Sequence, residues 1–144
     1  MSFMKKMDNF LNCLDVLKRA EFKQATEDEI YRMGIIGQFN LTFELAWKAL
    51  QEVLRLHSVS GAENGSPREI LKLGYANGFV DDSQAWLLML KKRNLAIHIY
   101  DEEEVDELIV LIRDSFITAF GRLADLLEKK LDEAKESDWN DKQL

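Results

Sequence analysis

The chain has 144 residues, of which 47% are hydrophobic and 31% charged, and its formal net charge is −7. This size and composition predict one folded domain over residues 1–144, and they exclude a disordered chain. The negative charge argues against a broad surface that follows nucleic-acid phosphates. We therefore expect no DNA partner, while a local basic site is still compatible with the charge.

The numbers of cysteine and histidine residues limit the disulfides and metal sites that the chain can form. The lone Cys13 cannot form an internal disulfide, and one cysteine with two histidines cannot build a zinc site within one chain. We expect no metal and no cofactor. The N-terminus leads into a mixed polar helix without the apolar core of a signal peptide, and the longest apolar run, 85–90, is too short to span a bilayer. The sequence therefore predicts a cytoplasmic protein without a membrane contact.

Apolar residues recur at steps of three and four along most of the chain, which is the period of helices packed on a core. The predicted helices cover about 3–20, 26–57, 66–77, 82–100 and 101–131. Their expected capping residues are Thr26 with Glu29, Ser66 with Glu69, Asp81 or Asp82, and Asp101 with Glu104 at the third helical position. The pattern predicts an all-α, up-and-down antiparallel four-helix bundle with one extra short helix.

The end of the chain, about residues 132–144, is polar and is expected to fray. Trp139 lies there without an obvious partner. It is either an interface anchor or part of a loose tail, and the polar surroundings favour the tail.

Polar side chains gather at the end of the fourth predicted helix. Arg93 lies on an otherwise apolar stripe with Trp86 and Leu90, so its stem should be buried and its guanidinium needs a partner. A glutamate at the edge of the core, such as Glu44, is the candidate. Periodicity alone favours this structural role of Arg93 over a functional one.

Asn94 and His98 are four residues apart, so they share a helix face and can meet one ligand. Arg93 and His98 are five apart, about 140° around an ideal helix, so a straight helix does not aim both at one atom. A helix end or a second protomer would have to bring them together. Tyr100 precedes the next predicted cap, where its hydroxyl can reach solvent or its ring can close the end of the bundle.

Two charge runs flank this stretch. Lys91, Lys92 and Arg93 form a small basic cluster suited to phosphate. The acidic run 101–104 resembles a metal site, but capping and favourable charge at a helix N-terminus explain it better.

Residues Arg93 to Tyr100 match the Arg-x4-His-x-Tyr pattern of the HEPN superfamily. Further blocks resemble one branch closely, the nucleotidyltransferase substrate-binding proteins, which are all-helical partners of minimal nucleotidyltransferases. These blocks are Phe43-Glu44-Leu45-Ala46-Trp47-Lys48, Ser66-Pro67-Arg68-Glu69, Gly78, Asp82, Trp86 and Arg93-Asn94 through Tyr100-Asp101-Glu102. The resemblance covers about residues 5–130.

The resemblance implies a helical bundle that forms homodimers and is encoded beside a small nucleotidyltransferase, often as a toxin–antitoxin pair. In related members the motif is the active site of a metal-independent ribonuclease, which here implies Arg93 and His98 as catalytic residues with Asn94 in support. In others the motif tyrosine accepts an adenylyl group, which implies Tyr100. The predicted substrate- or partner-binding residues are Glu44, Arg68, Lys92 and Arg93.

Three functions follow, in this order. The first is a substrate- or nucleotide-binding partner subunit of a minimal nucleotidyltransferase in a toxin–antitoxin pair. The chain is not the transferase itself, because it has no Gly-Ser phosphate loop and no convincing carboxylate pair. The second is an endoribonuclease toxin that cleaves RNA to a 2′,3′-cyclic phosphate, with His98 as general base, and is inhibited by adenylylation of Tyr100. The third is a purely structural helical dimer.

Overall fold

The computed structural model describes the backbone of residues 2–98 and 101–143 and the side chains of residues 5–93 and 101–136. Most of this part of the chain is helical, and it contains no strand. The elements are α1 (Ser2–Lys18), α2 (Phe22–Ala25), α3 (Glu29–Leu56), α4 (Pro67–Ala76), α5 (Ser83–His98), α6 (Glu102–Leu111), the π-helical turn η1 (Ile112–Phe116) and α7 (Ile117–Gln143).

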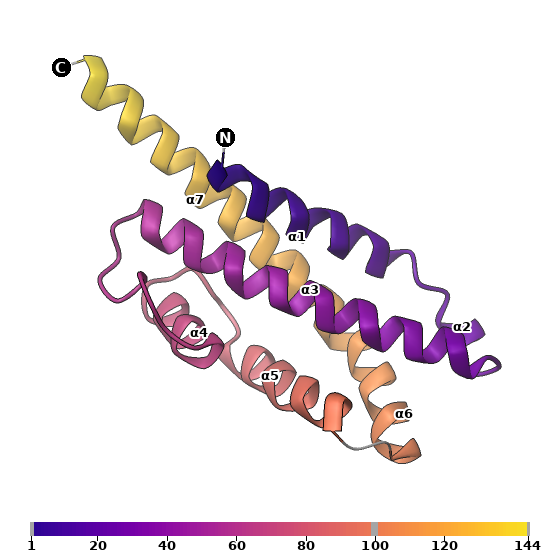
Figure 1. Cartoon of the computed structure of the whole chain (residues 1–144). Coiled ribbons are helices and arrows are strands. Elements are labelled where there is room, and N and C mark those ends of the chain that lie inside the picture. Colours follow the sequence, from indigo (N-terminus) through magenta and orange to yellow (C-terminus); the bar gives the residue numbers. More distant parts are fainter. Residues whose placement is uncertain (1, 99–100, 144) are drawn as a thin grey trace.

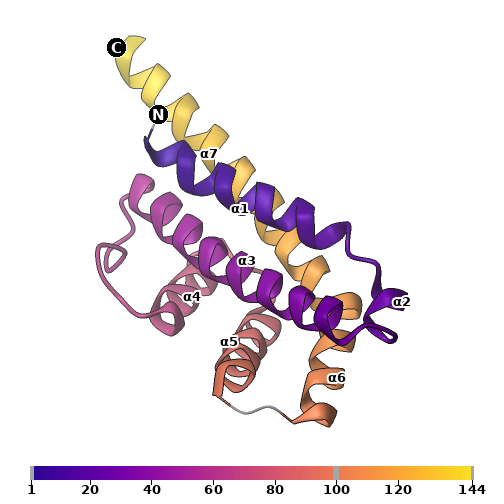
Figure 2. The ribbon, with the colours of Figure 1, turned by 45° about the vertical axis from the view of Figure 1, so that its right-hand side comes forward.

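The long helices alternate in direction, and α3 lies at their centre (Figure 1). α1 packs on one side of α3, and α4 and α5 lie on the other side in both views (Figure 2). α6, η1 and α7 form one continuous helix that bends where η1 adds an extra residue to the turn. The predicted all-α, antiparallel bundle is confirmed, with α4 as the extra short helix and α2 as an additional turn that the sequence did not predict.

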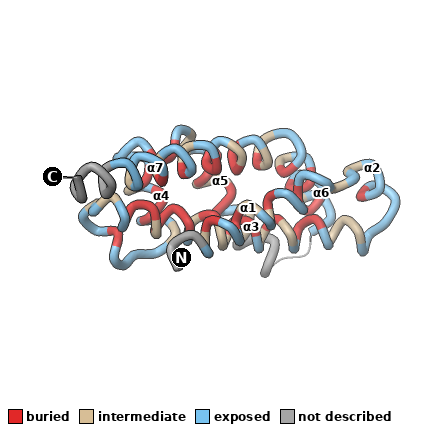
Figure 3. Tube along the Cα trace, turned by 90° about the horizontal axis from the view of Figure 1, so that it is seen from above, coloured by how far each residue is buried: buried red, intermediate tan, exposed pale blue. Residues whose placement is uncertain are grey.

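Aromatic rings fill the centre of the bundle. The rings of Phe39 and Phe116 stack with centroids 5.4 Å apart, and Trp86 meets Phe120 edge to face at 5.4 Å. All four side chains are fully buried, so each removes a large apolar area from water and ties its own helical segment to the core. Figure 3 shows the buried positions facing the space between the helices.

The helix starts follow the predicted capping residues, with one exception. Ser66 and Glu69 form the capping box at α4, Asp82 accepts from the Ala85 amide at 3.1 Å at α5, and Asp101 caps α6. The Thr26 prediction is wrong: its hydroxyl donates to the Lys23 carbonyl at 2.7 Å and ends α2.

Asp28 caps α3 instead and accepts from the Tyr31 amide at 3.1 Å. A threonine hydroxyl can bond a carbonyl behind it as readily as an amide ahead, and the carboxylate two residues later offers the stronger cap.

The turn between α4 and α5 brings these two helices back against α3. Gly78 adopts φ +78°, its amide donates to the Tyr75 carbonyl at 3.2 Å, and the Phe79 amide donates to the Gly74 carbonyl at 2.8 Å. This pair of bonds is the Schellman ending that the Asn77–Gly78 sequence predicts. The turn sends Phe79 into the core.

The C-terminal part of the chain differs from the prediction. We expected the helix to fray after about residue 131, but α7 continues to Gln143 (Figure 1). The side chain of Trp139 lies outside the described residues. Across the part of the chain that the structure describes, no helix combines the length and apolar character needed to cross a membrane.

Among the helical glycines, Gly74 should be the least tolerant of a side chain. A Cβ there would lie 2.9 Å from Leu50 Cδ2 and 3.0 Å from Val80 Cγ2, whereas a Cβ on Gly121 would meet nothing within 4 Å. We expect Gly74→Ala to lower the free energy of unfolding by about 1 kcal/mol, because the overpacking outweighs the gain in helix propensity. Gly121→Ala is the control and should raise it by up to about 1 kcal/mol. Urea unfolding measures both; equal gains for the two variants would contradict the close packing of α4 on α3.

Candidate functional site

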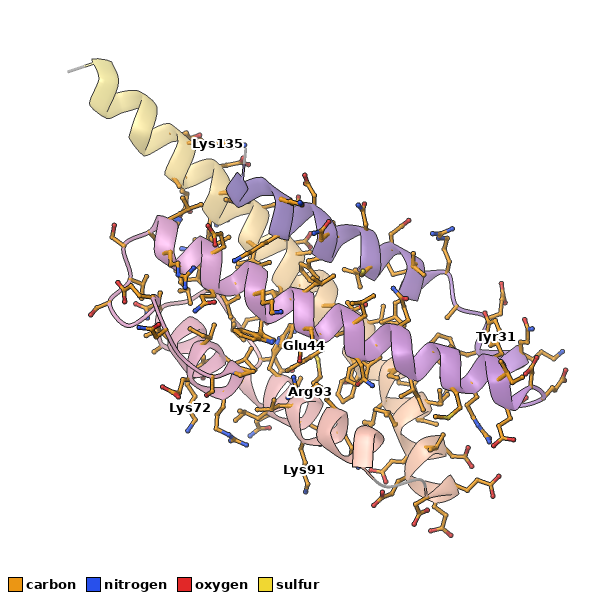
Figure 4. All side chains as sticks on the ribbon, in the orientation of Figure 1. Tyr31, Glu44, Lys72, Lys91, Arg93 and Lys135 are labelled. Carbon is orange, nitrogen blue, oxygen red and sulfur yellow. The ribbon has the colours of Figure 1, made fainter. Side chains whose placement is uncertain are left out.

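The candidate site begins with an ion pair between α5 and α3. Arg93 donates from Nη1 to Glu44 Oε1, and the other Glu44 oxygen, Oε2, accepts from Trp47 Nε1 at 3.0 Å. The guanidinium carbon of Arg93 lies 5.2 Å from the centroid of the Phe43 ring. Figure 4 shows Glu44 and Arg93 facing each other between the two helices. The predicted pairing of Arg93 with Glu44 is therefore confirmed.

This pair sits at the edge of the core. The Arg93 side chain is 17% exposed and that of Glu44 37%, and the neighbouring Phe43 ring packs against Trp86 with centroids 6.1 Å apart. Partial removal from water strengthens the attraction between the two charges, and the indole and phenyl rings restrict their rotation. The arrangement holds α5 against α3 at Arg93.

A second set of ion pairs holds the start of α6. Lys92, whose side chain is 12% exposed, pairs with Glu107 at 3.0 Å. Arg32 of α3 pairs with Asp106 at 3.1 Å and reaches Glu102 at 3.8 Å. Both helices that flank residues 99–100 are thus tied to the bundle on either side of that segment.

The basic cluster predicted from Lys91, Lys92 and Arg93 is not one exposed surface. Lys92 and Arg93 each bind a carboxylate on a different helix, and Lys91 is exposed and points away from α3 (Figure 4). Successive helical residues point about 100° apart, so three adjacent cations cannot face one ligand. Of the three residues of the predicted basic cluster, Lys91 alone is exposed, and Lys92 and Arg93 are partly buried and paired.

The acidic run 101–104 is used by the fold, as capping and charge predicted. Asp101 accepts from the amides of Glu103 at 2.9 Å and Glu104 at 3.4 Å. Glu104 Oε2 and Asn40 Oδ1 are buried and accept no hydrogen bond within the described residues. Buried acceptors without donors are rare and mark these two residues, which the sequence reading missed, as candidates for ligand contact. No periodic signal distinguishes them from ordinary polar positions.

The remaining predicted residues are distributed as follows. Asn94 and His98 belong to the backbone of α5, but their side chains, and all of Tyr100, lie outside the described residues. Arg68 is exposed in the first turn of α4 and makes no ion pair with any described side chain, so it does not join Arg93 and Glu44. Within the same residues, no group of three or more His, Cys, Asp or Glu side chains is placed to hold a metal ion.

The chain folds as an antiparallel helical bundle, and the backbone of Arg93 to His98, the first part of the Arg-x4-His-x-Tyr stretch, belongs to α5. Residues 5–129 match the family described as nucleotidyltransferase substrate binding protein like, and the chain belongs to this family. The resemblance read from the sequence is confirmed. No curated protein matches the chain.

Solved structures share this fold. A tri-AMPylated HEPN toxin of Shewanella oneidensis, solved in complex with its MNT antitoxin, is 17% identical with a TM-score of 0.72, covering 88% of this chain and 96% of that one. A Thermus thermophilus protein is 27% identical with a TM-score of 0.61, covering 87% and 98%. A Haemophilus influenzae protein, described as the substrate binding domain of a nucleotidyltransferase, is 18% identical with a TM-score of 0.69, covering 85% and 98%.

Glu44→Ala tests how much the Arg93–Glu44 pair contributes to the stability of the fold. It leaves Arg93 without this carboxylate and Trp47 without its acceptor, so we expect the free energy of unfolding to fall by about 2 kcal/mol. The control is Asp114→Ala, which breaks the exposed pair with Arg113 (Nε to Oδ1, 2.6 Å), where the hydrogen bond lowers the pKa of the Asp114 carboxyl. Asp114→Ala should leave the stability nearly unchanged, because solvent screens an ion pair at an exposed position. Equal effects in urea unfolding would show that the Arg93–Glu44 pair contributes nothing beyond a surface contact.

Proposed function

We propose that this chain is the substrate-binding partner subunit of a minimal nucleotidyltransferase, and that the pair forms a cytoplasmic toxin–antitoxin system. The observation that carries the proposal is the family match over residues 5–129, which includes the whole Arg-x4-His-x-Tyr stretch. The Shewanella oneidensis toxin, which shares the fold, was solved with an MNT antitoxin and carries AMP groups.

The braced geometry around residues 99–100 supports a role in presenting an acceptor. Arg93–Glu44 fixes α5 on α3, Lys92–Glu107 joins α5 to α6, and the Asp101 cap starts α6 directly after Tyr100. Because both flanking helices are anchored, they need little rearrangement when a partner enzyme engages the segment between them.

In the proposed reaction, the Tyr100 hydroxyl oxygen bonds to the α-phosphorus of ATP in the transferase site. The bond to pyrophosphate breaks, and the phenolic proton leaves to solvent or a base of the transferase. The product is a phosphodiester that adds negative charge next to the motif and blocks access to it.

The homodimer is part of the proposal. Val16, Ile30 and Leu41 are exposed apolar side chains on α1 and α3, and Ile30 is 85% exposed. Val16 and Ile30 line a hollow of about 400 Å³ between these helices. A monomer gains nothing from an apolar face of this kind, whereas a second copy would remove it from water.

The first experiment incubates the purified chain with ATP and the minimal nucleotidyltransferase encoded beside it, followed by intact-mass and peptide mass spectrometry. We expect one or more AMP additions in the wild type and none in Tyr100→Phe, because only the phenol oxygen is removed. Tyr31→Phe is the control and should be modified as the wild type is. Light scattering of the starting protein should give the mass of two chains. Modification of Tyr100→Phe at the wild-type level would remove Tyr100 as the acceptor.

The ribonuclease alternative is ranked second for a structural reason. Two of the three cations at positions 91–93 are already neutralised by Glu107 and Glu44, which leaves little free positive charge for an RNA backbone at this point. The motif residues Arg93 and His98 nevertheless keep this function testable, since cleavage by general base catalysis requires no metal.

Its test is incubation of the unmodified protein with total transfer RNA in EDTA, beside His98→Ala. If the binding-subunit function is the whole function, no cleavage is expected from either protein. Cleavage by the wild type alone, leaving 2′,3′-cyclic phosphate ends, would make the chain a ribonuclease and His98 its general base. Cleavage by both proteins would indicate a contaminating nuclease, which a repeat with Arg93→Ala identifies.

A further inference from the structure

The segment that contains α4 and α5 has the opposite charge to the rest of the molecule. Residues 67–98 carry five Lys or Arg against three Asp or Glu, whereas the whole chain has 19 against 26. Two of the three acids, Glu69 and Asp82, are occupied as helix caps. The α4–α5 hairpin is therefore a basic element on an acidic protein.

Three of its five cations are exposed and form no ion pair within the described residues. Arg68 and Lys72 are one turn apart on α4, and Lys91 is on α5; none of the three has an ion pair or hydrogen bond within the described residues. Figure 4 shows Lys72 and Lys91 both pointing away from α3. By contrast, Lys92 and Arg93, which are partly buried, are bound by carboxylates.

An apolar hollow lies between the two helices, and Lys72 is the cation that lines it. It measures about 240 Å³ and is lined by Leu71, Lys72, Tyr75, Ser83 and Leu87. Tyr75 is one turn after Lys72 on the same face of α4, and it is 53% exposed although it is a large aromatic side chain. The hollow is small for a whole ligand of ordinary size, but it accommodates one apolar side chain.

A shallow hollow for one anchor, a half-exposed tyrosine and a rim of unpaired cations are the features of a protein-docking surface for an acidic partner. A nucleotide site needs several donors that converge on the phosphates. Among the described residues of this face, the cations are spread over two helices, with Arg68 and Lys72 on α4 and Lys91 on α5. The rest of the chain carries 14 Lys or Arg against 23 Asp or Glu, so its net charge disfavours the same kind of partner.

We propose that the outer face of the α4–α5 hairpin, formed by Arg68, Lys72, Tyr75, Leu87 and Lys91, binds an acidic surface of the partner nucleotidyltransferase. One apolar side chain of the transferase enters the hollow beside Tyr75, and carboxylates of the transferase pair with the cations around it. This inference rests on the proposed function, since it names the surface by which the two proteins associate. The face is separate from the Arg93–Glu44 pair, which points inward to α3.

The test is titration calorimetry of the full chain with the minimal nucleotidyltransferase encoded beside it. Lys72→Glu with Lys91→Glu should raise the dissociation constant at least about tenfold, because it reverses two charges at the rim of the surface. Tyr75→Ala should also raise it at least about tenfold, because it removes the ring beside the hollow. The matched control is Lys129→Glu with Lys135→Glu, which makes the same charge change on two exposed lysines of α7. The control should bind within about twofold of the wild type. Thermal unfolding of each variant verifies that the fold is retained.

The outcomes separate the two proposals. If the wild type fails to bind the transferase, the proposed function is overturned, and the docking face with it. If the wild type binds and all the variants bind equally, only the docking face is overturned. Equal weakening by the two charge-reversed pairs would indicate a nonspecific charge effect and would also overturn it. If the hairpin variants lose binding of total transfer RNA but keep the transferase, the face belongs to RNA and the inference is wrong.

Discussion

The buried side of α3 is the constraint on which the rest of the structure depends. This 28-residue helix contacts α1, α2, α4, α5, α6 and α7, so a shift of α3 would disturb the packing of each of them. Both of its flanks carry an ion pair beside the apolar packing. Lys6 of α1 pairs with Glu52 at 3.3 Å, and Arg93 of α5 pairs with Glu44. The helix therefore contributes to the core and also anchors α5.

The general fold could be predicted from the sequence because each long helix carries its own signal. The caps at Ser66 and Asp101 and the ending at Gly78 are local, since every partner lies within a few residues in the chain. The start of α3 was not predictable in the same way. Thr26 and Asp28 can both cap a helix, and the Thr26 hydroxyl bonds the Lys23 carbonyl instead. The continuation of α7 to Gln143 could not be predicted from the sequence either, because the polar composition after residue 131 predicts a frayed end.

The candidate site was only partly predictable, for a related reason. The need of Arg93 for a carboxylate followed from its place on an apolar stripe, and Glu44 was a sound candidate because it lies on the longest helix. The third member, Trp47, could not be inferred, because its contact depends on which Glu44 oxygen Arg93 occupies. The sequence could not show which of the three adjacent cations would be paired. Arg93 pairs with a carboxylate 49 residues away and Lys92 with one 15 residues away, whereas Lys91 is exposed.

The opposite charges of the α4–α5 hairpin and of the rest of the chain give the molecule an electric dipole moment. Such a dipole acts over about a Debye length, some 8 Å at physiological ionic strength, before any side chains touch. An approaching acidic body experiences a torque that turns the hairpin toward it. The charge distribution thus sets orientation during diffusion, and the shape of the contact surface then has only to select among encounters that are already correctly aligned.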